Sequence, residues 1–210
     1  MGFFSGICSF VSGACSIIGG AIGSLGNAVS RALSIVGSAL SSAVINVVMG
    51  VGKILGAVNE KDRPEELGMK AVKAEKRLED FDNYKEYKSY LDSIELTKED
   101  MKKMEEHKVA YSYIGTGVCL QGIKETYEMP LTIGTFINLV KMGINDENKV
   151  KVVLDEYKEK NVRPDIDKMI SGKNITPMES DKVLEVLNEA LKKIENSSEI
   201  EEKLNKMLNQ

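Results

Sequence analysis

The sequence MGFFSGICSFVSGACSIIGGAIGSLGNAVS, residues 1–30, has no charged side chain, and ALSIVGSALSSAVINVVMGVG, residues 32–52, continues this pattern after Arg31. Of the chain's 28 Lys and Arg side chains only two precede residue 59, and all 32 Asp and Glu side chains follow it. Such a sharp change of composition indicates a change of solvent or partner at the same place. We therefore divide the chain into an apolar segment, residues 1–58, and a charged, soluble domain, residues 59–210.

The two uncharged runs predict a helical hairpin. A helix needs about 20 mostly apolar residues to cross the hydrocarbon core of a bilayer, and both runs reach that length. Gly26 and Asn27 offer a turn just before Arg31, where the first run ends. We therefore expect one helix near residues 3–25 and a returning helix near residues 28–56.

Two stripes of helical period run along this segment, one of small residues and one of aliphatic residues. We predict that the small stripe is the seam at which helices pack, because small residues let helix backbones approach closely in a membrane. In water each helical Gly instead costs about 1 kcal/mol relative to Ala. The predicted seam consists of Ser12, Ser16, Gly19, Gly23, Gly26, Ser30, Ser34 and Gly37. The aliphatic residues predicted to face lipid are Ile18, Ile22, Leu25, Val29, Leu33, Val36, Leu40, Val44 and Val47.

Two other interpretations of the apolar segment stay open. It could be buried inside a multi-chain assembly, such as a phage tail or a contractile secretion apparatus, or it could be a flexible tail held by a chaperone. The segment is not a secretory signal peptide, because no Lys or Arg precedes Arg31. We therefore expect membrane association after export from a bacterial cytoplasm without a signal peptide.

The charged domain is predicted to be all-α, because no stretch shows sustained period-two alternation. A 15-residue uncharged run, residues 109–123, is too short for a comfortable membrane span and is typical of a core helix. One expected helix covers residues 64–94, and a second begins after Thr97 and continues through the uncharged run. Further helices are expected over residues 131–142, 146–160, 166–170 and about 176–195, and a last helix begins at Ser198. The overall expectation is an all-α chain in which an apolar helical hairpin precedes a soluble multi-helix domain.

The strongest local signal is the sequence Thr176-Pro177-Met178-Glu179. Thr at the cap, Pro at the first helical position and Glu at the third predict a capping box. The helix that follows is expected to turn one apolar face inward: Val183, Leu184, Leu187, Leu191 and Ile194.

No residue pattern points to catalysis, a metal or another cofactor, and we expect no enzyme activity. His107, the only histidine, lies among charged residues typical of a solvated helix face. It could activate Cys119 only if the helix between them broke near Gly115 or Gly117, because one helix would hold them about 18 Å apart. The mixed charge of the domain, without a long basic block, does not favour nucleic-acid binding.

The opening Met-Gly-Phe-Phe-Ser and the Gly/Ser/Ala/Ile repeats after it resemble the glycine-zipper segments of membrane-inserting bacterial toxins and secreted effectors, over residues 1–57. The resemblance implies insertion into a target membrane and carries no catalytic residue. The expected partners are a lipid membrane and further copies of the chain, together with a carrier, chaperone or immunity protein for the helical domain.

Overall fold

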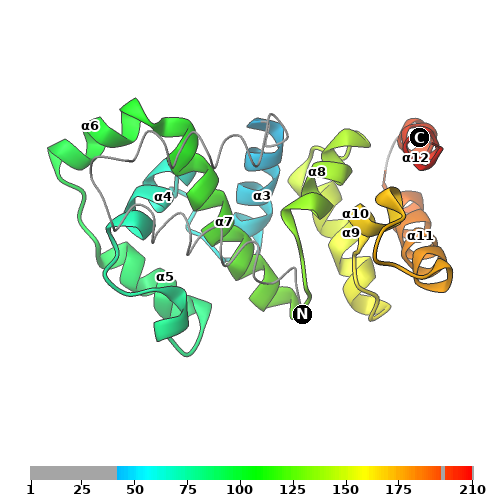
Figure 1. Cartoon of the computed structure of the whole chain (residues 1–210), viewed down its shortest axis with the longest axis horizontal. Helices are drawn as coiled ribbons and strands as arrows, with labels where there is room; N and C mark the ends of the chain where they lie inside the picture. Colours follow the sequence, from blue (N-terminus) through cyan, green and yellow to red (C-terminus); the bar gives the residue numbers. More distant parts are fainter. Residues whose placement is uncertain (1–41, 195–196, 210) are drawn as a thin grey trace. The chain divides into compact units, whose positions relative to one another are not determined.

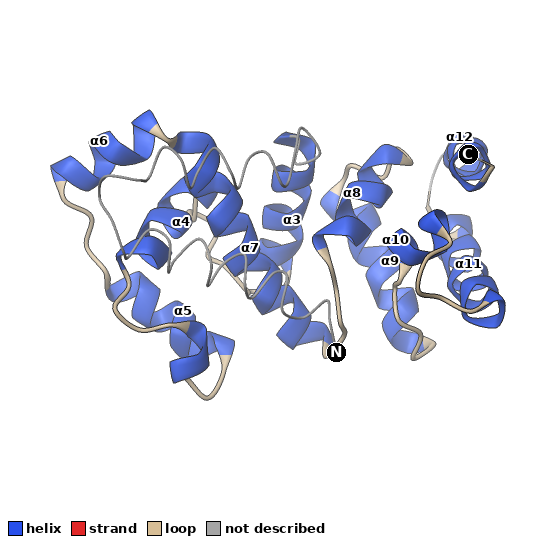
Figure 2. Ribbon diagram, in the orientation of Figure 1, coloured by secondary structure: helices blue, strands red, loops and turns tan. Residues whose placement is uncertain are grey.

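A computed structural model describes residues 42–194 and 197–209. These residues form ten α-helices and one short 3-10 helix, without a strand (Figures 1 and 2). The all-α prediction is therefore confirmed for the described part of the chain. The predicted hairpin lies almost entirely outside it, and only the end of the returning helix is described, as α3 (Ser42–Ile54).

The described helices belong to two compact units. One contains Gly52–Gly122, and the other contains Ser42–Val51 together with Ile123–Gln210. The boundary predicted at residue 58, between an apolar segment and a charged domain, stays a prediction. Among the residues that follow Ser41 in the predicted apolar segment, Val51, Ala57 and Val58 are buried.

The unit that contains Gly52–Gly122 is built from α4 and the elements that follow it. These elements are α4 (Pro64–Lys73), the 3-10 helix η2 (Leu78–Asp80), α5 (Tyr84–Ser93), α6 (Lys98–Glu106) and the first three quarters of α7 (Lys108–Tyr127). Within this unit α4 packs against both α5 and α6. Gly68 and Gly115 let α4 and α7 approach closely, since a Cβ on either glycine would overlap a backbone carbonyl of the other helix.

The single helix predicted over residues 64–94 is wrong, because α4 ends at Lys73 and α5 begins only at Tyr84. The Tyr90 hydroxyl accepts hydrogen bonds from the backbone N–H groups of Glu75 (3.1 Å) and Lys76 (3.4 Å), which supplies the partner that a continued helix would have given them. Asn83 then caps α5 by accepting a hydrogen bond from the N–H of Glu86 at 2.9 Å.

The predicted cap at Thr97 is confirmed, since Thr97 and Asp100 form a reciprocal capping box at the start of α6. The expected uninterrupted helix is wrong at one residue: α6 ends at Glu106, His107 leaves the helical conformation with φ −125° and ψ 33°, and α7 begins at Lys108.

The second unit is built mainly from α8 (Ile133–Lys141), α9 (Glu147–Glu159), α10 (Ile166–Ser171), α11 (Pro177–Lys192) and α12 (Ser197–Leu208). Here α11 packs against α9, α10 and α12, and α10 also packs against α8. The capping box at Thr176 and Glu179 is confirmed. The predicted inward residues of α11 are buried except Leu184, which is partly exposed.

The α9–α11 packing combines apolar side chains with a buried hydrogen bond. Val153, Leu154 and Tyr157 of α9 are fully buried, and the Tyr157 hydroxyl donates a 2.8 Å hydrogen bond to the backbone carbonyl of Val183. Burial raises the pKa of this phenol, so it stays protonated and remains a donor.

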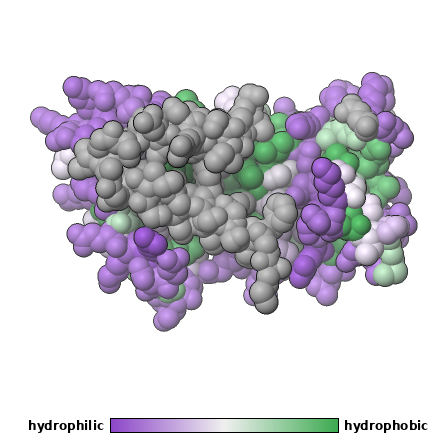
Figure 3. All heavy atoms as spheres, in the orientation of Figure 1, coloured by the Kyte–Doolittle hydropathy of each residue, from purple (hydrophilic) through white to green (hydrophobic). Residues whose placement is uncertain are grey.

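Hydrophilic side chains cover much of the described surface on the face shown in Figure 3. Four large apolar side chains are exposed in the described part: Ile54, Met101, Val109 and Met178. A search of the described helices finds none with the length and apolar composition needed to cross a membrane.

Candidate functional site

The candidate site from the sequence is the apolar segment, and the structure places only its last part. The predicted seam lies wholly outside the described residues: Ser12, Ser16, Gly19, Gly23, Gly26, Ser30, Ser34 and Gly37. So do seven of the residues predicted to face lipid: Ile18, Ile22, Leu25, Val29, Leu33, Val36 and Leu40. The remaining two, Val44 and Val47, lie on α3.

Val44 and Val47 are buried within the protein, each with 1% of its surface exposed. Val48 and Val51 on the same helix are fully buried. Fully burying an aliphatic side chain of this size stabilises a fold by roughly 1.5–3 kcal/mol. In this structure the two valines therefore face protein, and the lipid-facing stripe stays a prediction only for residues before Ser42.

Two glycines of α3 lie against neighbouring side chains. A Cβ on Gly50 would come within 2.8 Å of the Glu147 Cβ, and a Cβ on Gly52 would overlap the Cys119 sulfur. Gly56, the partner of Gly52 in a GxxxG pair, lies beyond the end of α3 in the left-handed conformation, with φ +69°. This GxxxG pair is therefore not a helix-packing seam, because its two glycines do not share a helix.

An ion cluster ties the loop after α3 to α5. The Lys88 ammonium lies 2.5 Å from Asp92 and 2.9 Å from Asp62, and only 9% of the Lys88 side chain is exposed. Asn59 completes the cluster, because its backbone N–H donates to Asp62 (2.8 Å) and its side-chain amide donates to Asp92 (3.2 Å). The four-residue spacing of Lys88 and Asp92 is visible in the sequence, but nothing there predicts the contact with Asp62, 26 positions earlier.

The start of α4 carries a second buried charge. Glu65 exposes 7% of its side chain and pairs with Arg63 (3.5 Å) and with Lys108 at the start of α7 (3.4 Å). A carboxylate in the first turn also interacts favourably with the helix dipole. These contacts link the first turns of α4 and α7 within one unit.

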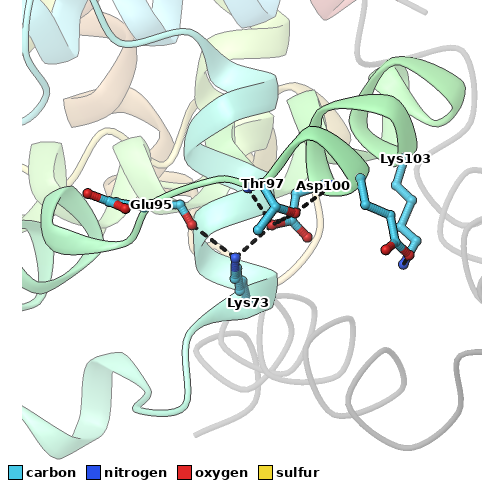
Figure 4. A network of polar contacts seen from close by, with 6 residues as sticks. Lys73, Glu95, Thr97, Asp100 and Lys103 are labelled. Atoms are coloured by element: carbon cyan, nitrogen blue, oxygen red, sulfur yellow. Dashed lines mark hydrogen bonds and ion pairs between the residues drawn. The ribbon is translucent and has the colours of Figure 1, made fainter.

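A third polar network joins the end of α4 to the start of α6 (Figure 4). The Lys73 ammonium donates to the Glu95 backbone carbonyl at 2.9 Å and to the Asp100 carboxylate at 2.6 Å. The same carboxylate oxygen accepts hydrogen bonds from the backbone N–H and the hydroxyl of Thr97, both at 2.8 Å. Lys73 and then the Thr97 donors lower the pKa of Asp100 to about 2.

Cys119 and His107 are not arranged as a nucleophile and base. Helix α7 continues without a break from Lys108 through Cys119, so Cys119 lies about 16.5 Å along the helix axis from Lys108, the residue that follows His107. Cys119 is fully buried, and burial raises the pKa of its thiol to about 12. A nucleophilic cysteine requires a thiolate, which these surroundings disfavour.

No group of three or more His, Cys, Asp or Glu side chains within the described ranges could hold a metal ion. In the three polar networks described above, each carboxylate pairs with Lys, Arg or a helix cap, and each network links a helix to another helix or to a loop.

Comparison with known protein families, with curated proteins and with solved structures finds no match for this chain.

Proposed function

We propose that this protein is a membrane-inserting bacterial effector or toxin-like protein, in which residues before Ser42 enter a target membrane and the helical body carries them. The observation that carries the proposal is the uncharged run of residues 1–30, which is long enough for a membrane span and has a small and an aliphatic stripe of helical period. The many Ser residues make insertion reversible rather than permanent.

The burial of α3 sharpens this proposal. Val47, Val48 and Val51 give α3 a protein-facing apolar surface, so the helix serves as the attachment of the membrane-directed residues to the body. The membrane-active stretch then ends near Ser41. The helical body, residues 42–209, would bind a carrier, a delivery machine or an immunity protein.

Liposome flotation and dye release with the full-length chain test the proposal. Replacing Ile18 and Ile22 by Lys puts two charges on the aliphatic stripe, and a charge at the bilayer centre costs about 2.5–3.5 kcal/mol. We expect the double variant to lose flotation and leakage. The matched control replaces two exposed apolar residues of the body, Val109 and Met178, by Lys.

The control variant should float and release dye as the unmodified chain does. The proposal fails if the unmodified protein neither floats nor causes leakage, or if the Ile18 and Ile22 substitutions leave both properties unchanged. A truncated chain that begins at Lys61 lacks the whole apolar segment, but it is a poor negative control for membrane binding. It also lacks α3, whose buried valines belong to the protein interior.

The burial of Val44 and Val47 also favours a second candidate function, a structural or adaptor protein of a phage tail or contractile secretion apparatus. In that case the rest of the aliphatic stripe would likewise pack against protein. The same experiment separates the two functions: the adaptor predicts no flotation, together with sedimentation of the full-length chain as a stable assembly.

A further inference from the structure

The loop between α9 and α10 forms a cavity of about 480 Å³ together with one face of α11. The loop turns away from α9 at Asn161, which has φ 51°. The N–H of Val162 then donates to the Tyr157 carbonyl at 3.0 Å, which satisfies the end of the helix. This volume lies within the range of about 300–1,000 Å³ typical of ligand pockets.

The cavity has an aliphatic part. It is lined by Val162 from the loop, Ile175 from the segment before α11, and Val183 and Val186 from α11. Val183 and Val186 also form part of the buried core, with 3% and 5% exposure, so the framework behind this wall is well packed. Val162 and Ile175 are partly exposed, and they offer the apolar surface that a branched aliphatic group would contact.

Most charged groups around the cavity already have partners. Lys160 pairs with Glu189 at 2.7 Å, Asp165 pairs with Lys168 at 3.1 Å, and Glu179 accepts two hydrogen bonds from Thr176 in the capping box. Their charges are therefore largely satisfied within the protein.

Two cations on the cavity wall, Arg163 and Lys182, form no ion pair with any residue in the described part of the chain. A guanidinium binds a carboxylate through two parallel hydrogen bonds, and an ammonium adds a point charge. The acidic side chains nearby, among them Glu185, disfavour ligands with more than one negative charge. The cavity therefore offers these two cations to a ligand with a single anionic group.

We propose that this cavity binds a carboxylate adjoining a branched aliphatic group, with the carboxylate on Arg163 and Lys182 and the aliphatic group against Val162 and Ile175. This chemistry occurs both in small acylated amino acids and at the carboxyl terminus of a peptide that ends in Leu, Val or Ile. The inference stands independently of membrane insertion, because all its residues belong to one unit of the body.

Three ligands of nearly matched shape test the two halves of the site by amide NMR titration of the full-length protein. N-acetyl-L-leucine carries both groups, its amide N-acetyl-L-leucinamide lacks the charge, and N-acetylglycine lacks the aliphatic side chain. We expect saturable shifts among residues 160–189 with the first ligand, at a Kd on the order of 1 mM, and about tenfold weaker binding of the other two.

A pair of variants tests the protein side. Arg163→Gln should weaken N-acetyl-L-leucine binding about tenfold, since it removes a charge-assisted pair. Lys192→Gln removes the same charge from an exposed position of α11 outside the cavity, and it should bind as the unmodified chain does.

The peptide acetyl-Ala-Ala-Leu with a free carboxylate distinguishes the two sources. Tighter binding than N-acetyl-L-leucine supports a peptide terminus, and equal or weaker binding supports a small molecule. The proposal is overturned if N-acetyl-L-leucine gives no saturable shift at roughly 10 mM, if its amide binds equally well, or if Arg163→Gln leaves binding unchanged.

Discussion

The Lys88 ammonium on α5 lies 2.9 Å from the Asp62 carboxylate, in the loop that connects α3 to α4. This contact fixes the chain directly after α3. Because Lys88 is almost fully covered, its charge depends on Asp62 and Asp92 for compensation.

Replacing Lys88 by Ala should therefore lower the free energy of unfolding by about 2 kcal/mol, because two carboxylates lose their cation. This loss of stability is smaller than the roughly 3–5 kcal/mol typical of breaking a fully buried ion pair, because the Asp92 side chain is 39% exposed. Urea denaturation measures the change. Lys85→Ala, at an exposed position of the same helix, is the control and should change stability by less than about 0.5 kcal/mol. Equal midpoints for the two variants would refute a stabilising role of the cluster.

Asp100 should make the fold sensitive to acid. Its pKa is about 2 in the folded chain against an ordinary value of 3.8, so the ionised form is stabilised by folding. The contribution is fully present above pH 3.8 and is lost as the pH falls towards 2. Asp100→Asn should thus destabilise the protein by about 1 kcal/mol at pH 7, allowing for solvent screening of a partly exposed group. The difference from the unmodified chain should shrink between pH 4 and pH 2 in thermal unfolding, and a constant difference across this window would contradict the assignment.

Asp167 should show the opposite dependence. One oxygen of its carboxyl group is buried without a hydrogen-bond partner in the described part of the chain, and burial raises its pKa. The protonated form is then favoured by folding, so this contribution is present at low pH and is lost as the pH rises through the raised pKa. Asp167→Asn should increase stability by about 1 kcal/mol at pH 7 and have little effect near pH 3. Urea denaturation at pH 7 and at pH 3 measures the free energy of unfolding of both chains. If Asp167→Asn is less stable than the unmodified chain at pH 7, the carboxylate is well solvated and the prediction is wrong.

Helix starts were predictable where one nearby side chain marks them. Thr97 and Thr176 each form the expected box with an acidic residue three positions later. The helix over residues 146–160 was also predictable, because its apolar residues recur once per turn, and α9 covers Glu147–Glu159. The end of α4 at Lys73 was not predictable from the sequence. The hydrogen bonds that replace those of a continued helix include bonds to the Tyr90 hydroxyl, which belongs to another helix.

The candidate site was less predictable for a related physical reason. The aliphatic stripe has one helical period throughout, and period alone does not tell lipid from protein interior. Val44 and Val47 continue the stripe of Ile18 and Ile22, yet they pack inside the helical body. Likewise the cavity beside α11 depends on Arg163 and Lys182, which come from different elements and share no spacing signal.

The seam prediction can be tested on the membrane-bound chain. Replacing Gly19 and Gly23 by Leu should weaken association of the chains by blocking close helix approach, while leaving flotation with liposomes intact. Cross-linking in liposomes measures association, and Ala21→Leu, outside both predicted stripes, is the control. Oligomers of unchanged abundance in the double variant would eliminate these glycines as a packing seam.

The role of α3 in the body gives the last prediction. Val47 has 1% of its surface exposed, so Val47→Ala leaves a cavity and should lower the free energy of unfolding by about 2 kcal/mol in aqueous solution without lipid. Ile54→Ala removes a larger side chain from the same helix, but Ile54 is 41% exposed and its loss should have a smaller effect. Urea unfolding followed by circular dichroism compares the two. If Val47 instead serves only as a lipid-facing residue, Val47→Ala will unfold at the same urea concentration as the unmodified chain. Only its flotation with liposomes will then change. The two roles therefore give opposite results in the same pair of assays.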